Sequence, residues 1–237
     1  MNKIAVIIPA FNEAENLSAL IGEIGSLRQS FSPPLDAVIV NDHSTDRTLE
    51  VASRHNGAVI DLPINLGIGG AVQTGIKYAL ENGYAYALQV DGDGQHPPSE
   101  IPKLVRAMEE SQADLVIGSR FIRGAGFKST ISRRIGIKYF SFLIKLFSGQ
   151  RIADCTSGFR LFNRRAMELA AEYYPDQYPE PESIIRFSRR GLKIFETPVL
   201  MRPRQGGESS IRPMGALYYT IKVTLAMLFG GIKGWKT

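Results

Sequence analysis

Apolar and polar positions along this chain follow two alternating patterns. Short continuous apolar runs of strand length, such as residues 4–8, alternate with longer segments in which apolar residues recur at helical spacing. A continuous apolar run is typical of a parallel strand that is buried on both faces. The pattern predicts strands at residues 3–9, 36–41, 58–62, 84–90 and 114–118, and helices at residues 13–28, 45–54, 70–81 and 99–110.

The second half of the chain is less regular. Helical spacing recurs at residues 131–147 and 164–173, and a strand pattern follows at residues 192–199. Strands and helices that alternate along a chain are joined by right-handed crossovers, which give a mostly parallel sheet. We therefore expect an α/β fold with a Rossmann-like, mostly parallel sheet flanked by helices.

The chain ends in a long apolar segment, residues 214–232, which is interrupted only by two threonines and Lys222. Its length is close to that of a membrane span, but the central lysine makes a spanning helix the least favoured interpretation. A core helix fits, and so does a helix that lies on a membrane or a membrane protein, because basic and aromatic residues flank the segment. We expect a main domain at residues 1–210 and a C-terminal apolar helix at residues 211–237.

The composition is that of a soluble globular protein, with 44% hydrophobic and 22% charged residues. The single cysteine, Cys155, excludes an internal disulfide framework and suits a reducing compartment. Met1 leads directly into the first predicted strand, which leaves no room for a signal peptide. These features predict a cytoplasmic protein.

Charge is distributed unevenly along the chain. Residues 1–114 hold 7 basic and 15 acidic residues, whereas residues 115–237 hold 21 basic and 8 acidic residues. Residues 115–153 contain eight basic residues and no acidic one. A basic segment of this length predicts a phosphate ligand or an anionic surface. Nucleic acid is not the expected partner, because no recognised nucleic-acid-binding motif accompanies the charge.

A compact acidic turn, Asp91-Gly92-Asp93-Gly94-Gln95, follows the fourth predicted strand. Mg²⁺ and Mn²⁺ prefer oxygen ligands and usually combine one or two carboxylates with phosphates of the substrate. Open α/β sheets bind their ligands at the carboxyl ends of the strands. The turn therefore predicts a metal site formed by Asp91 and Asp93 that holds a nucleotide diphosphate.

Two other interpretations of the acidic turn are available. An EF-hand that began at Asp91 would need glycine at its sixth position and glutamate at its twelfth. Those positions hold His96 and Pro102, which excludes the EF-hand. A simple Asp-Gly turn with solvated carboxylates is the other alternative.

Polar residues also follow the first two predicted strands. The first strand ends in Pro9-Ala10-Phe11-Asn12-Glu13, and the second in Asn41-Asp42-His43-Ser44-Thr45-Asp46. A carboxylate at a strand end can accept hydrogen bonds from a base or a ribose, which makes Asp42 a candidate ligand and Asp46 a second one. Asn12, Ser44 and Thr45 are also good N-cap residues for the helices that follow.

A glycine-rich segment, Asn65-Leu66-Gly67-Ile68-Gly69-Gly70, leads into the third predicted helix. A dinucleotide fingerprint would require a third glycine at position 72, where the chain has Val72, so an NAD site is disfavoured. A glycine-rich approach to a helix N-terminus still suits a nucleotide. Asn65 and Gly67 are therefore candidate nucleotide ligands.

These motifs, with Asp154-x-x-Ser157-Gly158-Phe159-Arg160 after them, occur in one order along the chain. Together they resemble the family-2 inverting glycosyltransferases of the GT-A fold. They look most like the dolichol- or polyprenol-phosphate mannosyl- and glucosyltransferases, and the resemblance covers roughly residues 3–205. It implies a nucleotide-sugar donor of the GDP-mannose or UDP-glucose type and a Mg²⁺ or Mn²⁺ ion.

The resemblance also implies roles for individual residues. It places Asp42 on the base and ribose. It also implies that Asp91, Asp93 and Gln95 form the metal and diphosphate site. Arg202 and Arg204, before two glycines, are candidates for a clamp on the diphosphate. The expected nucleotide-sugar site comprises Pro9, Ala10, Asn12, Glu13, Asp42, Asp46, Asn65, Gly67, Asp91, Gly92, Asp93 and Arg204.

The chemistry of the acceptor decides which further residues are needed. An acceptor phosphate is already ionised and needs cations for positioning, whereas a sugar hydroxyl needs a carboxylate base. Asp154 is the first candidate for the base, followed by Glu180 and Glu182, and an ion pair with an arginine is the alternative role of Asp154. The expected acceptor site comprises Ser119, Arg120, Arg133, Arg134 and Ser157, and the expected catalytic residues are Asp154, Arg120 and Arg134.

The leading hypothesis is a metal-dependent, inverting glycosyltransferase that moves a hexose from a nucleotide sugar to a polyprenyl or dolichyl phosphate. It would act as a peripheral protein on the cytoplasmic face of the membrane. One alternative is transfer to a glycan hydroxyl in polysaccharide assembly. Another is a non-catalytic nucleotide-sugar-binding subunit that serves a small membrane protein.

Overall fold

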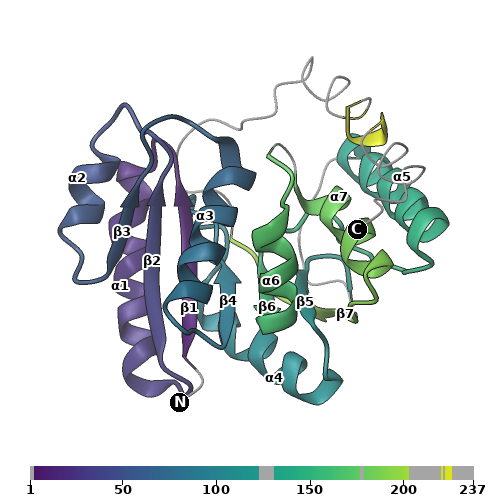
Figure 1. Cartoon of the computed structure of the whole chain (residues 1–237), viewed down its shortest axis with the longest axis horizontal. Coiled ribbons are helices and arrows are strands. Elements are labelled where there is room, and N and C mark those ends of the chain that lie inside the picture. The colour runs from purple at the N-terminus through teal and green to yellow at the C-terminus, as the bar shows by residue number, and fades with distance from the viewer. Residues whose placement is uncertain (1–2, 123–130, 177–178, 203–219, 221, 226–237) are drawn as a thin grey trace.

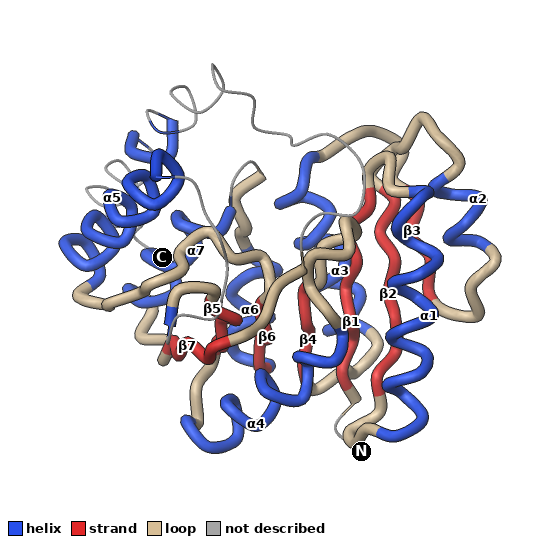
Figure 2. Tube along the Cα trace, turned by 180° about the vertical axis from the view of Figure 1, so that it is seen from behind, coloured by secondary structure: helices blue, strands red, loops and turns tan. Residues whose placement is uncertain are grey.

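The protein is described by a computed structural model at residues 3–122, 131–176, 179–202, 220 and 222–225. The described chain forms one seven-stranded sheet with helices on both faces (Figures 1 and 2). The strand order is β3-β2-β1-β4-β6-β5-β7. The strands are β1 Ile4–Ala10, β2 Leu35–Asn41, β3 Ala58–Asp61, β4 Tyr86–Gln89, β5 Leu115–Ser119, β6 Arg160–Asn163 and β7 Ile194–Pro198.

The helices alternate with the strands along the first half of the chain and then follow one another more irregularly. A short 3₁₀ turn, η1 Pro98–Glu100, precedes α4. The helices are α1 Ala14–Ser30, α2 Thr48–Ser53, α3 Gly67–Glu81, α4 Ile101–Ser111, α5 Ile131–Ser148, α6 Arg164–Glu172 and α7 Pro179–Arg189.

Strands β1 to β4 confirm the parallel arrangement that the apolar runs predict. Ile4 pairs with Leu35 of β2 and Tyr86 of β4, and Ala10 pairs with Asn41 at the ends of β1 and β2. Side chains that follow these strands therefore gather at one edge of the sheet, as the sequence predicts for the motif residues.

Strand β6 lies antiparallel between β4 and β5, and the sequence pattern did not predict it. Its four residues, Arg160-Leu161-Phe162-Asn163, begin and end with a polar side chain, so they form no apolar run of strand length. The sheet is mixed but mostly parallel, which confirms the expected fold class.

The core has two layers, one on each face of the sheet. One layer contains buried residues of α3, α5, α6 and α7, and the other contains buried residues of α1, α2 and α4. Alternate residues of β1 enter different layers, because successive strand side chains point to opposite faces. Ala5 and Ile7 pack with the first layer, and Ile4, Val6 and Ile8 with the second.

Helix α7 is a second element that the sequence pattern missed. Pro179 and Pro181 stand in its first turn, where the missing backbone N–H groups have no helical partner to lose. The two prolines therefore stand at the start of a helix. Helix α2 starts at Thr48 rather than at residue 45, because the Asp46 carboxylate accepts hydrogen bonds from the Thr48 backbone N–H and hydroxyl, at 2.8 and 2.5 Å.

Most of the apolar segment at residues 214–232 lies outside the described residues. Residue 220 and residues 222–225 are helical, and Val223 is buried. Within the described parts of the chain, no helix combines the length and the apolar character that crossing a membrane requires.

Candidate active site

The ends of β1 and β2 are joined by hydrogen bonds between their loops. The Asn12 side-chain oxygen accepts from the backbone N–H groups of Thr45 and Asp46, at 2.8 and 3.3 Å, and the Asn12 N–H donates to the Ser44 hydroxyl at 3.1 Å. Asn12 adopts a left-handed backbone conformation with φ of 55°. It therefore holds the second loop and makes no capping bond to α1, contrary to the capping interpretation.

The N-terminus of α1 is instead capped from the loop after β2. The Thr48 hydroxyl accepts from the Glu13 N–H at 2.8 Å, and an Asp46 oxygen accepts from the Ala14 N–H at 3.3 Å. Burial opposes ionisation of Asp46, but the bonds from Thr48 and Ala14 outweigh it and lower the pKa of Asp46. Asp46 is thus an ionised structural link at the edge of the site.

Asp42 connects the end of β2 to the glycine-rich segment. One of its carboxylate oxygens accepts from the Leu66 N–H at 2.7 Å, and its backbone carbonyl accepts from the Asn65 side chain at 3.1 Å. Asn65 in turn accepts from the N–H of Gly67, which has φ of +77°. Burial raises the pKa of Asp42, although bonds from the backbone of Leu66 and Gly67 oppose the rise. The predicted nucleotide ligands Asp42, Asn65 and Gly67 are therefore one bonded unit.

The carboxylate of Asp91 is held from several sides. Gln89, fully buried at the end of β4, donates from its side-chain nitrogen to an Asp91 oxygen at 3.1 Å. The Asp91 N–H donates to Nδ1 of His96 at 3.1 Å, so this ring nitrogen is the acceptor of the bond. The His96 ring stacks on Phe159, with ring centroids 5.0 Å apart. Asp91 is therefore positioned before any ligand arrives.

Gly92 brings the acidic turn against the end of β1. A methyl group at Gly92 would stand 3.1 Å from the Pro9 carbonyl oxygen and 3.3 Å from a side-chain carbon of Glu13. Asp93 accepts from the Gln95 N–H at 3.0 Å, which closes the turn. The motif residues of β1, β2 and β4 thus meet at one edge of the sheet.

Arg120 and Asp154 form a buried, bidentate ion pair. Nε and Nη2 of Arg120 donate to the two Asp154 oxygens at 2.6 and 2.7 Å, and the Arg120 backbone N–H donates to the same carboxylate at 3.0 Å. Burial alone would lower the pKa of Arg120, but Asp154 and also Asp91 act to raise it above its ordinary value. Arg120 therefore lies within electrostatic reach of the acidic turn.

A comparison with known protein families identifies the family of this chain. The profile described as "Glycosyl transferase family 2" matches residues 5–169, which is more than half of the chain. The chain belongs to glycosyl transferase family 2. The resemblance inferred from the motifs is confirmed, and with it the class of enzyme.

Two relatives of this glycosyltransferase have names that state an activity. The undecaprenyl-phosphate mannosyltransferase of Micrococcus luteus is 30% identical over 218 residues, which cover 88% of this chain and 87% of that protein. The dolichol-phosphate mannosyltransferase of Pyrococcus furiosus is 31% identical over 217 residues, which cover 89% of this chain and 59% of that protein.

The fold is shared with a solved enzyme. Glucosyl-3-phosphoglycerate synthase of Mycobacterium tuberculosis, crystallised with Mn²⁺, UDP-glucose and phosphoglyceric acid, superposes with a TM-score of 0.72 at 20% identity. The match covers 97% of this chain and 79% of that chain. The likeness confirms the GT-A fold of this glycosyltransferase.

The donor set of the acidic turn fits a divalent cation in this glycosyltransferase. Asp91 and Asp93 are partly exposed at the strand end, and the Asp91 carboxylate is held in place from behind. Among the described residues, no group of three or more His, Cys, Asp and Glu side chains is placed to hold a metal ion. Two carboxylates and one amide are the donor set expected when substrate phosphates complete the coordination of Mg²⁺.

Two predicted acceptor residues of the glycosyltransferase, Ser119 and Ser157, are buried. The Ser157 hydroxyl donates to the Gly118 carbonyl at 2.7 Å, and Ser119 is fully buried beside Glu196. The Ser157 bond holds the end of β5, which leads into Arg120. Arg133 and Arg134 stand in the first turn of α5, but their side chains lie outside the described residues, as does Arg204.

Arg202, the other candidate for a clamp, is engaged elsewhere. Its guanidinium pairs with Glu23 of α1 at 2.6 Å. Its backbone N–H donates to the Gln95 carbonyl of the acidic turn at 3.0 Å. Arg202 therefore links the chain after β7 to the acidic turn, and its guanidinium charge is paired with Glu23.

Several residues that shape the site were not identified from the sequence. Glu196 accepts from the backbone N–H groups of Ala153 and Asp154 at 2.7 and 2.8 Å, and burial raises its pKa against those bonds. The sequence does contain a sign that Gln89 is functional, because it is a lone polar residue near the end of an apolar strand. Glu196 and His96 have no comparable local signal, since their partners are distant in the sequence.

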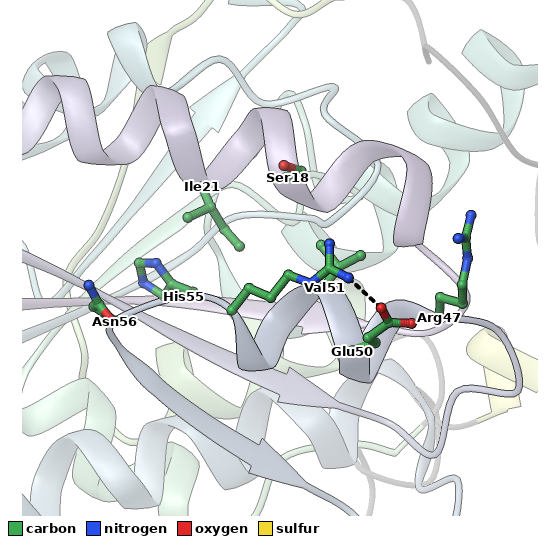
Figure 3. Close-up of a pocket in the computed structure, with 8 residues that line it drawn as sticks. Ser18, Ile21, Arg47, Glu50, Val51, His55 and Asn56 are labelled. Atoms are coloured by element: carbon green, nitrogen blue, oxygen red, sulfur yellow. Dashed lines mark hydrogen bonds and ion pairs between the residues drawn. The ribbon is translucent and has the colours of Figure 1, made fainter.

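A separate groove lies between α1 and α2, outside the candidate active site. Figure 3 shows its walls, in which Glu50 and Arg54 form an ion pair. The groove has a volume of about 510 Å³ and is open to solvent. It contains none of the residues of the acidic turn and is lined by Ser18, Ile21, Arg47, Glu50, Val51, Arg54, His55 and Asn56.

Proposed function

We propose that this glycosyltransferase moves one hexose from a nucleotide sugar of the GDP-mannose or UDP-glucose type to a polyprenyl phosphate, with inversion. The observation that supports this proposal most is that the buried guanidinium of Arg120 lies near the acidic turn, whose carboxylates suit a metal ion. Arg120 is within electrostatic reach of Asp91, while Asp154 holds the guanidinium in place. A site of this kind suits two phosphate-bearing substrates.

We propose that the donor occupies the edge formed by the ends of β1, β2 and β4. Asp42 would meet the base or ribose, and Pro9 to Glu13 would line the nucleotide. Asp91, Asp93 and Gln95 would hold Mg²⁺ or Mn²⁺. When bound, the cation would neutralise the charge that grows on the leaving diphosphate. Gln89 keeps the Asp91 carboxylate oriented for that role.

The phosphate acceptor is supported by the state of Asp154. Both of its oxygens accept from Arg120, and the residue is fully buried, so it is not available as a base. An ionised phosphate needs no base and is positioned by cations. We assign that positioning to Arg120, Arg134 and Arg133. Ser119 and Ser157 support the Arg120 loop.

A second candidate function is transfer to a glycan hydroxyl, and Glu180 favours it. Burial raises the pKa of Glu180, and the charges of Arg160, Asp91 and Arg120 all act on it. A carboxyl group with a raised pKa among site charges suits a general base. The two candidate functions therefore differ in whether Glu180 is needed.

A panel of substrates tests both functions. GDP-mannose, UDP-glucose and UDP-N-acetylglucosamine would each be offered with undecaprenyl phosphate, dolichyl phosphate and free glycans, and products identified by mass and by the NMR coupling of the new anomeric proton. We expect a polyprenyl-phosphate hexose of inverted configuration, formed almost equally well by Glu180→Gln. Transfer only to glycans, abolished by Glu180→Gln, would instead establish the second function.

We further propose that the protein is peripheral on the cytoplasmic face of the membrane. A polyprenyl phosphate keeps its chain in the bilayer, so the enzyme must come to the surface to reach the phosphate. Contact through the C-terminal apolar segment with lipid or with a small membrane protein would serve the same purpose. Fractionation of cells with an antibody to the full chain tests the location.

A further inference from the structure

Helix α5 is apolar on its outer face as well as on its inner face. Ile137, Phe140 and Ile144 are buried in the core, as expected for a helix that covers a sheet. The outward residues are also large and apolar, which is unusual because an exposed helix face is normally polar. Their exposed fractions are 39% for Tyr139, 61% for Phe142 and 63% for Leu146.

Lysines accompany these apolar side chains. Lys138 and Lys145 are exposed and stand on the same side of α5, about one helical turn from Phe142. Residues 115–153, which include the whole of α5, contain no acidic residue. The outer face of α5 therefore combines apolar surface with uncompensated positive charge from its own segment.

The surface continues onto the C-terminal helical turn. The Tyr139 hydroxyl and the Thr224 hydroxyl lie 3.2 Å apart, within hydrogen-bond distance, and Val223 is buried. Leu225, in the same turn, has 46% of its surface exposed. We call this surface the α5 face, which consists of Lys138, Tyr139, Phe142, Lys145, Leu146 and Leu225.

The inner side of α5 contacts Cys155, the residue that follows Asp154 in the sequence. The Ser141 hydroxyl lies 3.9 Å from the sulfur of Cys155, and that sulfur lies 4.0 Å from the Ile137 carbonyl oxygen. Cys155 follows Asp154, the partner of Arg120. Figure 1 shows α5 beyond β5 and β7, toward the end of the sheet to which β1 and β2 run. A surface that meets the α5 face is thus one helix away from Arg120.

We propose that the α5 face is the surface by which this protein docks on an anionic lipid bilayer. Aromatic and aliphatic side chains enter the boundary between headgroups and acyl chains, while lysines extend to the anionic headgroups. A stable protein interface typically takes about 20–30 residues from each partner, whereas the α5 face, as far as the described residues define it, consists of six. The inference rests on the proposed function, since docking here brings a membrane phosphate to the Arg120 side of the site.

Sedimentation with lipid vesicles tests the apolar contribution. The full chain would be mixed at low salt with phosphatidylcholine vesicles that contain or lack phosphatidylglycerol. We expect binding to the anionic vesicles only, and a loss of about tenfold or more in vesicle affinity for Phe142→Asp, because the apolar contact of a large side chain is removed. Phe195→Asp is the matched control, since Phe195 on β7 is 43% exposed but lies outside the α5 face. Circular dichroism would verify that both variants fold.

A charge reversal tests the lysines without touching the apolar residues. Lys145→Glu should weaken binding to anionic vesicles by about tenfold, and added salt should remove most of the difference. Lys77→Glu, a reversal at a lysine that is also exposed but lies on α3, should leave binding unchanged. Equal effects of the two reversals would mean that only the total charge matters, and the proposal would fail.

Other outcomes also overturn the inference. Absence of binding to anionic vesicles, or full binding by Phe142→Asp, would rule out lipid docking by this face. A dimer that dissociates in Phe142→Asp without any change in vesicle binding would make the face a protein interface. Vesicle binding is measured without donor or acceptor, so it is independent of the transfer assay. Docking by the α5 face with no transfer to polyprenyl phosphate would refute the proposed function and leave this inference standing.

Discussion

Gly158 lies directly behind the carboxylate of Asp91. A methyl group at Gly158 would stand 2.7 and 2.8 Å from the two Asp91 oxygens and 2.9 Å from the Gln89 side-chain nitrogen. The segment before β6 therefore forms the rear wall of the acidic turn. Any side chain at Gly158 would displace the carboxylate or the amide that holds it.

The first prediction concerns this contact. Gly158→Ala should weaken Mn²⁺ binding and lower the rate of transfer by about tenfold or more, since displacement of a metal ligand by about 1 Å can cost a hundredfold. Mn²⁺ affinity would be measured by electron paramagnetic resonance, independently of turnover. Gly22→Ala is the control, because nothing lies within 4 Å of the added methyl group on α1. Unchanged Mn²⁺ affinity in Gly158→Ala would show that Asp91 is not a ligand.

The carboxylates of the acidic turn should be essential for activity and dispensable for folding. Asp91→Ala or Asp93→Ala should abolish transfer while the thermal unfolding temperature stays near that of the unchanged protein, because both side chains are partly exposed and lie outside the core. Activity would be measured across a Mn²⁺ titration, with Glu109→Ala on α4 as control. Near-normal turnover at any Mn²⁺ concentration would contradict the metal assignment.

The ion pair between Arg120 and Asp154 should matter for stability. Asp154→Ala leaves a buried guanidinium without its partner and should destabilise the protein by about 3–5 kcal/mol. The double variant Arg120→Met/Asp154→Leu should recover part of that loss, because no buried charge is left unpaired. Urea denaturation measures both values. Glu168→Ala, which breaks the exposed pair of Arg164 and Glu168, is the control and should cost at most about 1 kcal/mol.

Arg134 should serve the acceptor and not the donor. Arg134→Ala should raise the acceptor KM or lower kcat by roughly ten- to a hundredfold, the value of a charge-assisted hydrogen bond of about 1.5–3 kcal/mol. Nucleotide-sugar affinity, measured by calorimetry, should be little changed. If Arg134→Ala weakened nucleotide-sugar binding instead, the acceptor assignment would be wrong.

Glu196 should make stability depend on pH. Burial raises its folded-state pKa, so the folded protein retains a proton that the unfolded chain loses, and stability falls as the pH rises from the ordinary glutamate pKa through the raised value. Glutamine at position 196 does not titrate, so Glu196→Gln does not lose stability in this way. The unfolding temperature of Glu196→Gln minus that of the unchanged protein should therefore increase as the pH rises through that window. Glu109→Gln on α4 controls for removal of an exposed charge. A relative stability of Glu196→Gln that declines with rising pH would reverse the sign and contradict the prediction.

The alternation of strands and helices up to β5 follows from the sequence, because apolar runs and helical spacing are local patterns. The predicted boundaries differ by a few residues where side-chain bonds intervene, as at Thr48 of α2. The parallel strands also place the motif residues at one edge of the sheet, which is why Asp42 and Asp91 could be assigned to one site. The family resemblance depends on these same positions.

Only the tertiary structure decided how those residues are held. The antiparallel insertion of β6, the pairing of Asp154 with Arg120 and the position of Gly158 behind Asp91 all join segments that are distant along the chain. Asn12 likewise looks like a helix cap in the sequence, but it binds the loop after β2. Local patterns determine which residues follow a strand, because they reflect burial along one segment. Packing between segments determines which groups remain free for chemistry, because each partner comes from elsewhere in the fold.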